Sequence, residues 1–241
     1  MIPYYGSKKR LAKYYPAPGL DTIVEPFAGF AHYSLHGQNW RKQVILIEKY
    51  EPVARTWKYL ISASKKDIQA LPEIEPGDDI RKHSQLCQEE IWLMGFCLNM
   101  GAARPKYSIG PWGNQWENHR RQIINNLYKI KHWRIIHDDY ITAPDIEATW
   151  FIDPPYQSGG QGYTMSFKKI NIDELKSFCL SRKGQLIVCE NSSATWLPFK
   201  KLKEHKSGNS RYKTGDMKTT ECIFTKNCKK SLQQIDIFKR P

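Results

Sequence analysis

The sequence lacks any long hydrophobic run. No stretch reaches the roughly 18 consecutive apolar residues that a membrane-spanning helix requires, which excludes such a helix. Residues 1–8 also lack the apolar core of a secretory signal. We therefore expect an intracellular, cytoplasmic protein. With 241 residues and 40% hydrophobic side chains, the chain suffices for one large domain, or for a core domain that carries an inserted lobe.

Paired metal-ligand motifs are also missing. The six cysteines are scattered, without a Cys-x-x-Cys pair. His83 and Cys87 can share one helical face, but two side chains do not complete a zinc site. Lone cysteines in a cytosolic chain are mostly small buried hydrophobic residues. We therefore predict no metal cofactor.

Positive charge is in excess. There are 37 Lys and Arg against 24 Asp and Glu, a formal net charge of +13. Residues 200–241 contribute +8 of it (12 basic minus 4 acidic), whereas residues 67–80 contain five acids and no Lys or Arg. Such an excess favours polyanionic partners through phosphate contacts. Charge alone distinguishes neither DNA from RNA nor a nucleic-acid surface from a solvated basic tail.

Short runs rich in Ile and Val alternate with helical patterns. The predicted strands cover residues 22–25, 44–48, 133–137, 149–153 and 185–190, with an antiparallel pair near 209–213 and 219–225. The predicted helices cover residues 31–37, 51–62 and 173–182, the last capped by Asn171. Alternation of this kind predicts an α/β fold with a Rossmann-like, mostly parallel sheet.

The middle of the chain interrupts this alternation. Residues 86–98 are apolar almost all round, as in a buried helix. Residues 99–113 combine glycines, prolines, aromatics and bases and indicate an exposed loop or ribbon, and helical spacing returns over 119–131. We therefore predict a mainly helical lobe, residues 64–131, inserted into a domain formed by residues 1–63 and 132–241.

The strongest motif is Asp153-Pro154-Pro155-Tyr156, which follows an apolar strand. Two prolines cannot continue a central strand, so the chain must leave the sheet as a stiff loop at the strand's carboxyl end. Open α/β sheets bind ligands at that edge. The Asp153 carboxylate and the Pro154 carbonyl can accept both N–H groups of an aromatic amine, while Tyr156 can stack on its ring. The alternative is an ordinary Pro-Pro turn capped by Asp.

Several motifs in order resemble the Dam-like DNA adenine-N6 methyltransferases over most of the chain. They are Tyr4-Tyr5-Gly6-Ser7-Lys8, Glu25-Pro26-Phe27-Ala28-Gly29-Phe30-Ala31, Glu48, His137-Asp138-Asp139-Tyr140, the Asp153 motif, Leu186-Ile187-Val188-Cys189-Glu190-Asn191, Lys213-Thr214-Gly215 and Lys218-Thr219-Thr220-Glu221. The cofactor loop departs from the family: it has one glycine where many relatives have two, so that Ala31 narrows the approach to the cofactor.

The resemblance implies a methyltransferase-type sheet and S-adenosylmethionine as cofactor, with S-adenosylhomocysteine as product and no metal. Asp153, Pro154 and Tyr156 are the expected catalytic residues. The expected cofactor contacts are Tyr5, Gly6, Lys8, Glu25, Phe27, Gly29, Glu48, Asp139 and Asp153. A Gly29 turn lets backbone amides approach a ligand, and Glu48 can accept from ribose hydroxyls, as acids do at this place in dinucleotide folds. Asp138 stays an alternative to Asp139.

The predicted lobe carries the expected contacts with double-stranded DNA. These are Arg104, Lys106, Tyr107, Trp112, Arg120 and Arg121. Basic side chains can contact phosphates, and the aromatic side chains between them can stack beside a flipped nucleobase. The alternative is that tryptophans such as Trp116 pack the lobe while only arginines face outward. Tyr163 and Phe167 are candidates to cover the flipped base.

We therefore predict a site-specific enzyme that methylates N6 of a flipped-out adenine in DNA. Two alternatives keep the same fold: an RNA adenine or cytosine-N4 methyltransferase, and an inactive nucleic-acid-binding relative. Asp at the first motif position favours adenine, because related cytosine enzymes more often carry Ser there. The target sequence, the biological role and the oligomeric state stay open.

Overall fold

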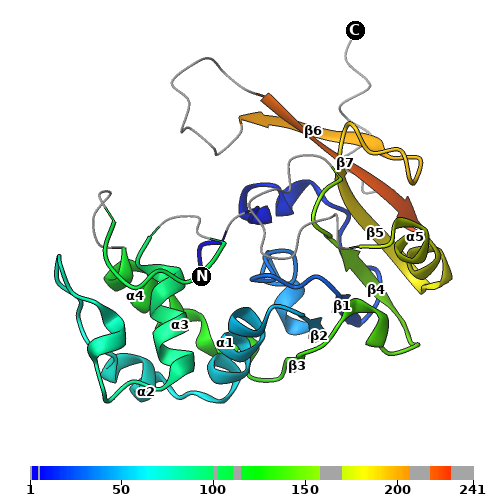
Figure 1. Cartoon of the computed structure of the whole chain (residues 1–241). Helices are drawn as coiled ribbons and strands as arrows, with labels where there is room; N and C mark the ends of the chain where they lie inside the picture. The colour runs from blue at the N-terminus through cyan, green and yellow to red at the C-terminus, as the bar shows by residue number, and fades with distance from the viewer. Residues whose placement is uncertain are drawn as a thin grey trace, which may run out of the picture.

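A computed structural model describes residues 2–4, 6–99, 103–110, 115–157, 170–206 and 218–228. Its centre is a seven-stranded sheet in the order β3-β2-β1-β4-β5-β7-β6 (Figure 1). The strands are β1 (Thr22–Glu25), β2 (Gln43–Ile47), β3 (Arg134–Ile136), β4 (Glu147–Ile152), β5 (Lys183–Asn191), β6 (Lys200–Lys206) and β7 (Lys218–Lys226). β1 to β5 are parallel, and β7 lies antiparallel between β5 and β6. The predicted α/β fold with a Rossmann-like, mostly parallel sheet is confirmed.

The described residues also form α-helices. They are α1 (Glu51–Ser62), α2 (Lys65–Ala70), α3 (Gln88–Cys97), α4 (Trp116–Asn126) and α5 (Ile172–Ser181). Single 3-10 turns are η1 (Lys8–Arg10), η2 (Ala12–Tyr14), η3 (Asn39–Arg41), η4 (Ile80–Lys82), η5 (Leu127–Ile130) and η6 (Tyr140–Thr142). Helices α2, α3 and α4 gather beside α1, away from α5 (Figure 1). No helix in the described part of the chain is both long and apolar enough to cross a membrane.

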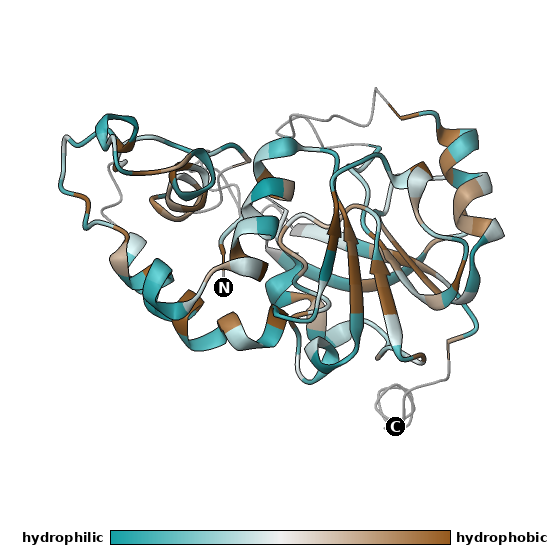
Figure 2. Ribbon diagram, turned by 90° about the horizontal axis from the view of Figure 1, so that it is seen from below, coloured by the Kyte–Doolittle hydropathy of each residue, from teal (hydrophilic) through white to brown (hydrophobic). Residues whose placement is uncertain are grey.

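Strand residues alternate between two apolar cores. Phe151 packs with Ile23 and Leu46 against the face that α1 and α3 cover, whereas Trp150 packs with Leu175 of α5 on the opposite face. Because successive side chains of a strand point to opposite faces, both halves of a continuous apolar run are buried. The central strands are accordingly hydrophobic over much of their length with more polar ends, while the helices alternate (Figure 2).

The described residues of segment 64–131 form α2, η4, α3, α4 and η5, joined by non-helical stretches. Helix α3 packs on α1, and its buried Leu93 and Phe96 belong to the same core as Trp57 of α1 and Phe30. Trp116 of α4 is completely buried, and its indole N–H donates to Pro72 O at 2.9 Å. Trp116 therefore packs the interior of this segment. Whether these helices form a DNA-recognition lobe stays a prediction.

One sequence prediction differs from the structure, and another concerns residues that the structure does not describe. The helix predicted over residues 31–37 is a series of turns, because Gly29 and Ala31 both adopt φ 45° and the buried Glu25 carboxylate accepts Ser34 N at 2.9 Å. The strand predicted over 209–213 lies outside the described residues, as does residue Lys213 of the expected hairpin. In the described part of the chain, β7 pairs antiparallel with β5 and with β6 (Lys200–Lys206), a strand that the sequence analysis did not predict.

Gly184, at the start of β5, supports the pairing of β5 with β4. Its φ is +93°, and an added Cβ would meet the backbone oxygen of Ala148 and lie 2.6 Å from Leu20 Cδ1. Gly184→Ala should lower the free energy of unfolding by about 2–4 kcal/mol, through backbone strain and overpacking. Urea unfolding measures this loss.

Gly77 provides the matched control. It has the same φ of +93°, but an added Cβ would meet nothing within 4 Å. Gly77→Ala should therefore cost only the strain, about 1–2 kcal/mol. Equal losses in the two variants would contradict the proposed clash between β4 and β5.

Candidate active site

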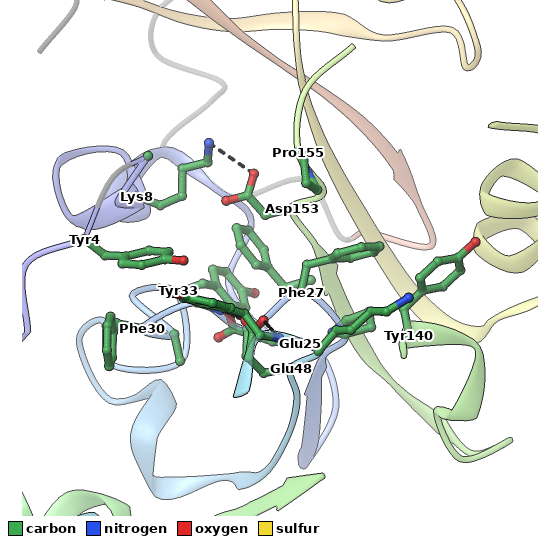
Figure 3. Close-up of a pocket in the computed structure, with 18 of the residues that line it drawn as sticks. Tyr4, Lys8, Glu25, Phe27, Phe30, Tyr33, Glu48, Tyr140, Asp153 and Pro155 are labelled. Carbon is green, nitrogen blue, oxygen red and sulfur yellow. Dashed lines mark hydrogen bonds and ion pairs between the residues drawn. The ribbon is translucent and has the colours of Figure 1, made fainter. Parts of the chain in front are cut away.

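A cavity opens at the carboxyl ends of the parallel strands (Figure 3). Glu25 ends β1, Glu48 follows β2, Asp139 follows β3, and Asp153 follows β4. Strand order reverses direction between β1 and β4, since β2 and β3 lie on one side and β5 on the other. Such a switch point is where open α/β sheets bind ligands.

Eight of the nine predicted cofactor-binding residues line this cavity. They are Gly6, Lys8, Glu25, Phe27, Gly29, Glu48, Asp139 and Asp153. The ninth, Tyr5, lies outside the described residues, whereas its neighbour Tyr4 lines the wall. Residues from five separate segments of the chain thus meet in one place. Their roles toward a cofactor remain predictions.

Glu48 ties the loop after β1 to the start of α1. Its Oε2 accepts Gly29 N at 2.9 Å and its Oε1 accepts Tyr50 N at 2.8 Å. Burial raises the pKa of this carboxyl, against the effect of these backbone donors. The Gly29 amide, expected to approach a ligand, therefore donates to Glu48 in this structure. The carboxylate has four lone-pair sites, so it retains acceptor capacity toward the cavity.

Glu25 holds the turns that follow β1. It is 2% exposed, and burial raises the pKa of its carboxyl to about 8. Gly29 O in turn accepts the Trp57 indole N–H at 2.7 Å. The loop after β1, which lines the cavity, is thus held by the buried Glu25 carboxylate and by a tryptophan of α1.

Aromatic rings form one side wall. Phe27 stacks on Tyr140 with centroids 5.0 Å apart and an interplanar angle of 28°. Asp139 also lines the cavity, and its Oδ2 accepts a hydrogen bond from Lys49 Nζ at 2.6 Å. Asp138 is exposed and is not among the described lining residues. Of the two acids left open by the sequence, Asp139 is therefore the one that faces the cavity.

Lys8 lies against the carboxylate of the Asp-Pro-Pro-Tyr motif at one end of the cavity (Figure 3). Its Nζ is 3.1 Å from Asp153 Oδ1 and 3.5 Å from Glu221 Oε1. It also donates to the Tyr156 hydroxyl and lies 4.3 Å from the Tyr156 ring centroid. Burial raises the pKa of Asp153 to about 6, although Lys8 opposes this shift.

The motif divides between the cavity and the interior. Asp153 and Pro155 line the cavity, and Pro154 is buried. Tyr156 packs against Lys8, and its hydroxyl donates to Glu221 Oε1 at 2.7 Å. The proposed stacking of Tyr156 on a base is therefore not visible in this arrangement, in which the phenol is part of a polar cluster.

Two buried acids near the Asp153 motif received no role in the sequence analysis, although both belong to motifs quoted there. Glu221 of β7 is 3% exposed. Glu190, at the end of β5, is completely buried and accepts Gln157 N at 2.6 Å and Asn191 N at 2.8 Å, which anchors the chain directly after the motif. Burial raises the pKa of Glu190 to about 7. An acid inside a predicted strand was the available signal for both residues.

The predicted DNA contacts differ in their surroundings. Arg104, Lys106 and Arg121 are exposed. Tyr107 is half-buried beneath the Arg81 guanidinium. Trp112, Tyr163 and Phe167 lie outside the described residues.

Arg120 is bonded within the fold. Its guanidinium donates to Leu71 O at 2.6 Å and to Glu117 Oε2 at 2.8 Å. These bonds tie α4 to the end of α2 and occupy donors that a phosphate contact would need.

No model of a known protein family matches the chain, and no curated protein matches it significantly. Among solved structures the chain is similar to the candidate methyltransferase yhhF of Escherichia coli, with 12% sequence identity and a TM-score of 0.38, over 92% of this chain and 84% of that one. It is also similar to a candidate methylase of Haemophilus influenzae, with 11% identity and a TM-score of 0.38, over 95% and 92% of the two chains.

Proposed function

We propose that this protein is an S-adenosylmethionine-dependent methyltransferase that acts on the N6 amino group of adenine in double-stranded DNA. The observation that carries the proposal is the placement of Asp153. Its carboxylate lies at the end of β4, at the switch point of the sheet, in a cavity that also contains the acids ending the neighbouring strands.

The cavity fits the chemistry of the proposed cofactor. S-adenosylmethionine combines an adenine, two ribose hydroxyls and a cationic methionine part. The lining offers the Phe27 and Tyr140 rings, acceptor oxygens on Glu48 and Asp139, and further acids against few cations. We assign the ribose to Glu48, the adenine amino group to Asp139, and the methionine part to the Gly6–Lys8 side.

The cofactor, when bound, supplies an electrophilic methyl group on a sulfonium. The chain's own residues act on the acceptor amine. An amino group attached to an aromatic ring is a poor nucleophile, because its lone pair is delocalised into the ring. The Asp153 carboxylate and the Pro154 carbonyl oxygen would accept its two N–H groups and draw the lone pair out of the ring plane. Fixed acceptors of this kind lower the barrier by alignment and by stabilising the developing positive charge on nitrogen.

Lys8 acts on Asp153. The ionised Asp153 carboxylate is only an acceptor of hydrogen bonds, whereas the protonated form carries an O–H donor and is a weaker acceptor for the amine. Burial alone would favour the protonated form, and the cation 3.1 Å away opposes it. We therefore infer that Lys8 keeps Asp153 charged and orients it.

Exposed Lys and Arg side chains next to the site support a nucleic acid as substrate. Lys9 and Arg10 follow Lys8 in η1 and are exposed. Lys13 and Lys203 are exposed as well, and their Nζ atoms lie 5.0 and 5.1 Å from the Tyr14 ring centroid. Clustered cations of this kind suit a phosphate backbone.

Transfer of a labelled methyl group tests the proposal. We expect label in duplex DNA, not in structured RNA, with N6-methyladenine as the product. Modification mapping of DNA from expressing cells should then reveal one repeated sequence context. Label only in RNA or on cytosine N4 would select an alternative acceptor, and an absence of S-adenosylmethionine binding would favour an inactive nucleic-acid-binding relative.

A further inference from the structure

A second buried acid lies behind the Lys8–Asp153 pair. Glu221 is in β7, between β5 and β6 in the sheet, opposite Asn191 on one side and Lys203 on the other. Residues two apart on a strand share a face. Glu221 therefore points to the same face as Ile223, which packs in the core with Tyr15 and Leu11.

One carboxylate oxygen of Glu221 interacts with three side chains, through two hydrogen bonds and one ion pair. Glu221 Oε1 accepts the Tyr15 hydroxyl at 2.7 Å and the Tyr156 hydroxyl at 2.7 Å. The same oxygen lies 3.5 Å from Lys8 Nζ. These partners come from the N-terminal segment and from the loop after β4, which are far apart in sequence.

We propose that Glu221 is a positioning residue for the methyl-transfer site, which holds Lys8 and Tyr156 in place and thereby aims the Asp153 carboxylate. This inference rests on the proposed function. A buried acid at 3% exposure is costly unless hydrogen-bonded or paired, and Glu221 has both kinds of partner. It does not contact the cavity itself; it acts through Lys8 and Tyr156.

The net charge of Lys8, Asp153 and Glu221 affects the pKa of Asp153. One lysine faces two carboxylates, so the buried group is net negative when both acids are ionised. The Glu221 charge therefore raises the pKa of Asp153, whereas Lys8 lowers it. The ionisable groups around Glu221 are Lys8, Tyr15, Asp153, Tyr156, Cys189, Cys222 and Lys203.

The Glu221→Gln variant distinguishes the effect of the Glu221 charge from the effect of its hydrogen bonds to the two tyrosines. The variant keeps an oxygen that accepts from both phenols, but it loses the negative charge. We expect the titration midpoint of Asp153, followed by carboxyl ¹³C NMR and assigned with Asp153→Asn, to fall by about one pH unit. The acid limb of kcat/KM for DNA methylation should move by the same amount. Glu221→Ala also removes the acceptor, and kcat should fall about tenfold further while cofactor binding persists.

Glu90→Gln is the matched control. Glu90 also accepts a phenol hydroxyl, from Tyr59 at 3.0 Å, but it lies on α3 and is not among the described residues that line the cavity. Its variant should leave the Asp153 midpoint unchanged. If Glu221→Gln only lowers the melting temperature and the midpoint stays in place, Glu221 is a structural residue and the inference fails. If wild-type protein methylates no DNA, the proposed function fails, and the NMR titration still decides the role of Glu221.

Discussion

Replacing Asp153 with alanine is expected to abolish DNA methylation while S-adenosylmethionine binding largely survives. The carboxylate is the proposed acceptor for the target amine, so its removal should lower kcat by about 10²–10⁴-fold. The proposed cofactor contacts of Glu48 and Asp139 lie at the ends of other strands and remain intact. Label transfer measures kcat, and titration calorimetry measures cofactor affinity.

Asp145→Ala is the control for this variant. Asp145 precedes the other end of β4 and forms an exposed ion pair with Lys183 at 2.9 Å, away from the described cavity lining. Its loss should change neither measurement. Near wild-type methylation by Asp153→Ala would refute the proposed mechanism, whatever the DNA sequence that the enzyme modifies.

Replacing Lys8 with methionine is expected to shift the pH dependence of methylation upward. Activity requires ionised Asp153, whose pKa lies at about 6, so wild-type activity should be present above pH 6 and disappear as the pH falls through that value. Without the lysine the pKa of Asp153 rises. The acid limb of kcat/KM should therefore move up by about 1–2 pH units, and activity at pH 7 should fall about 10-fold or more. A pH–rate profile checks both effects.

Lys42→Met removes a comparable pair elsewhere. Lys42 Nζ is also 3.1 Å from an aspartate oxygen, that of Asp21, but this pair is on the surface. The control should keep the wild-type profile. If Lys8→Met instead lowers the rate equally at every pH, Lys8 orients Asp153 without tuning its ionisation. Circular dichroism across the pH range confirms that the comparison is made on folded protein.

Local patterns were sufficient to predict most of the parallel sheet. The apolar runs around Val24, Leu46, Trp150 and Val188 are all in strands of that sheet, because a strand buried on both faces must be apolar throughout. Asn171 caps α5 by accepting Asp173 N and Glu174 N, as its position before an apolar helix predicted. Such features depend on residues that are close in sequence.

The loop after β1 was mispredicted because its conformation depends on residues that are distant in sequence. Residues 31–36 contain neither Gly nor Pro, and Gly37 suits the end of a helix, so a helix is a reasonable expectation from propensity. The conformation is set instead by distant partners: Glu48 binds Gly29 N, and Trp57 binds Gly29 O. Similarly, Arg120 resembles a surface base in sequence, but packing of α4 brings the Leu71 carbonyl to its guanidinium.

The amino-acid sequence by itself determined the order of the parallel strands along the chain, the turn at Asp153-Pro154-Pro155-Tyr156 and the acids that end or follow the first four of these strands. Propensity, apolar runs and the missing proline N–H groups act locally, so these features can be predicted residue by residue. Only the tertiary structure decided that Lys8, Asp153, Tyr156 and Glu221 form one buried cluster. Sheet pairing places β7 next to β5, and the N-terminal segment packs against them. Which charged side chains become buried together depends on this long-range packing, so it cannot be predicted from local sequence patterns.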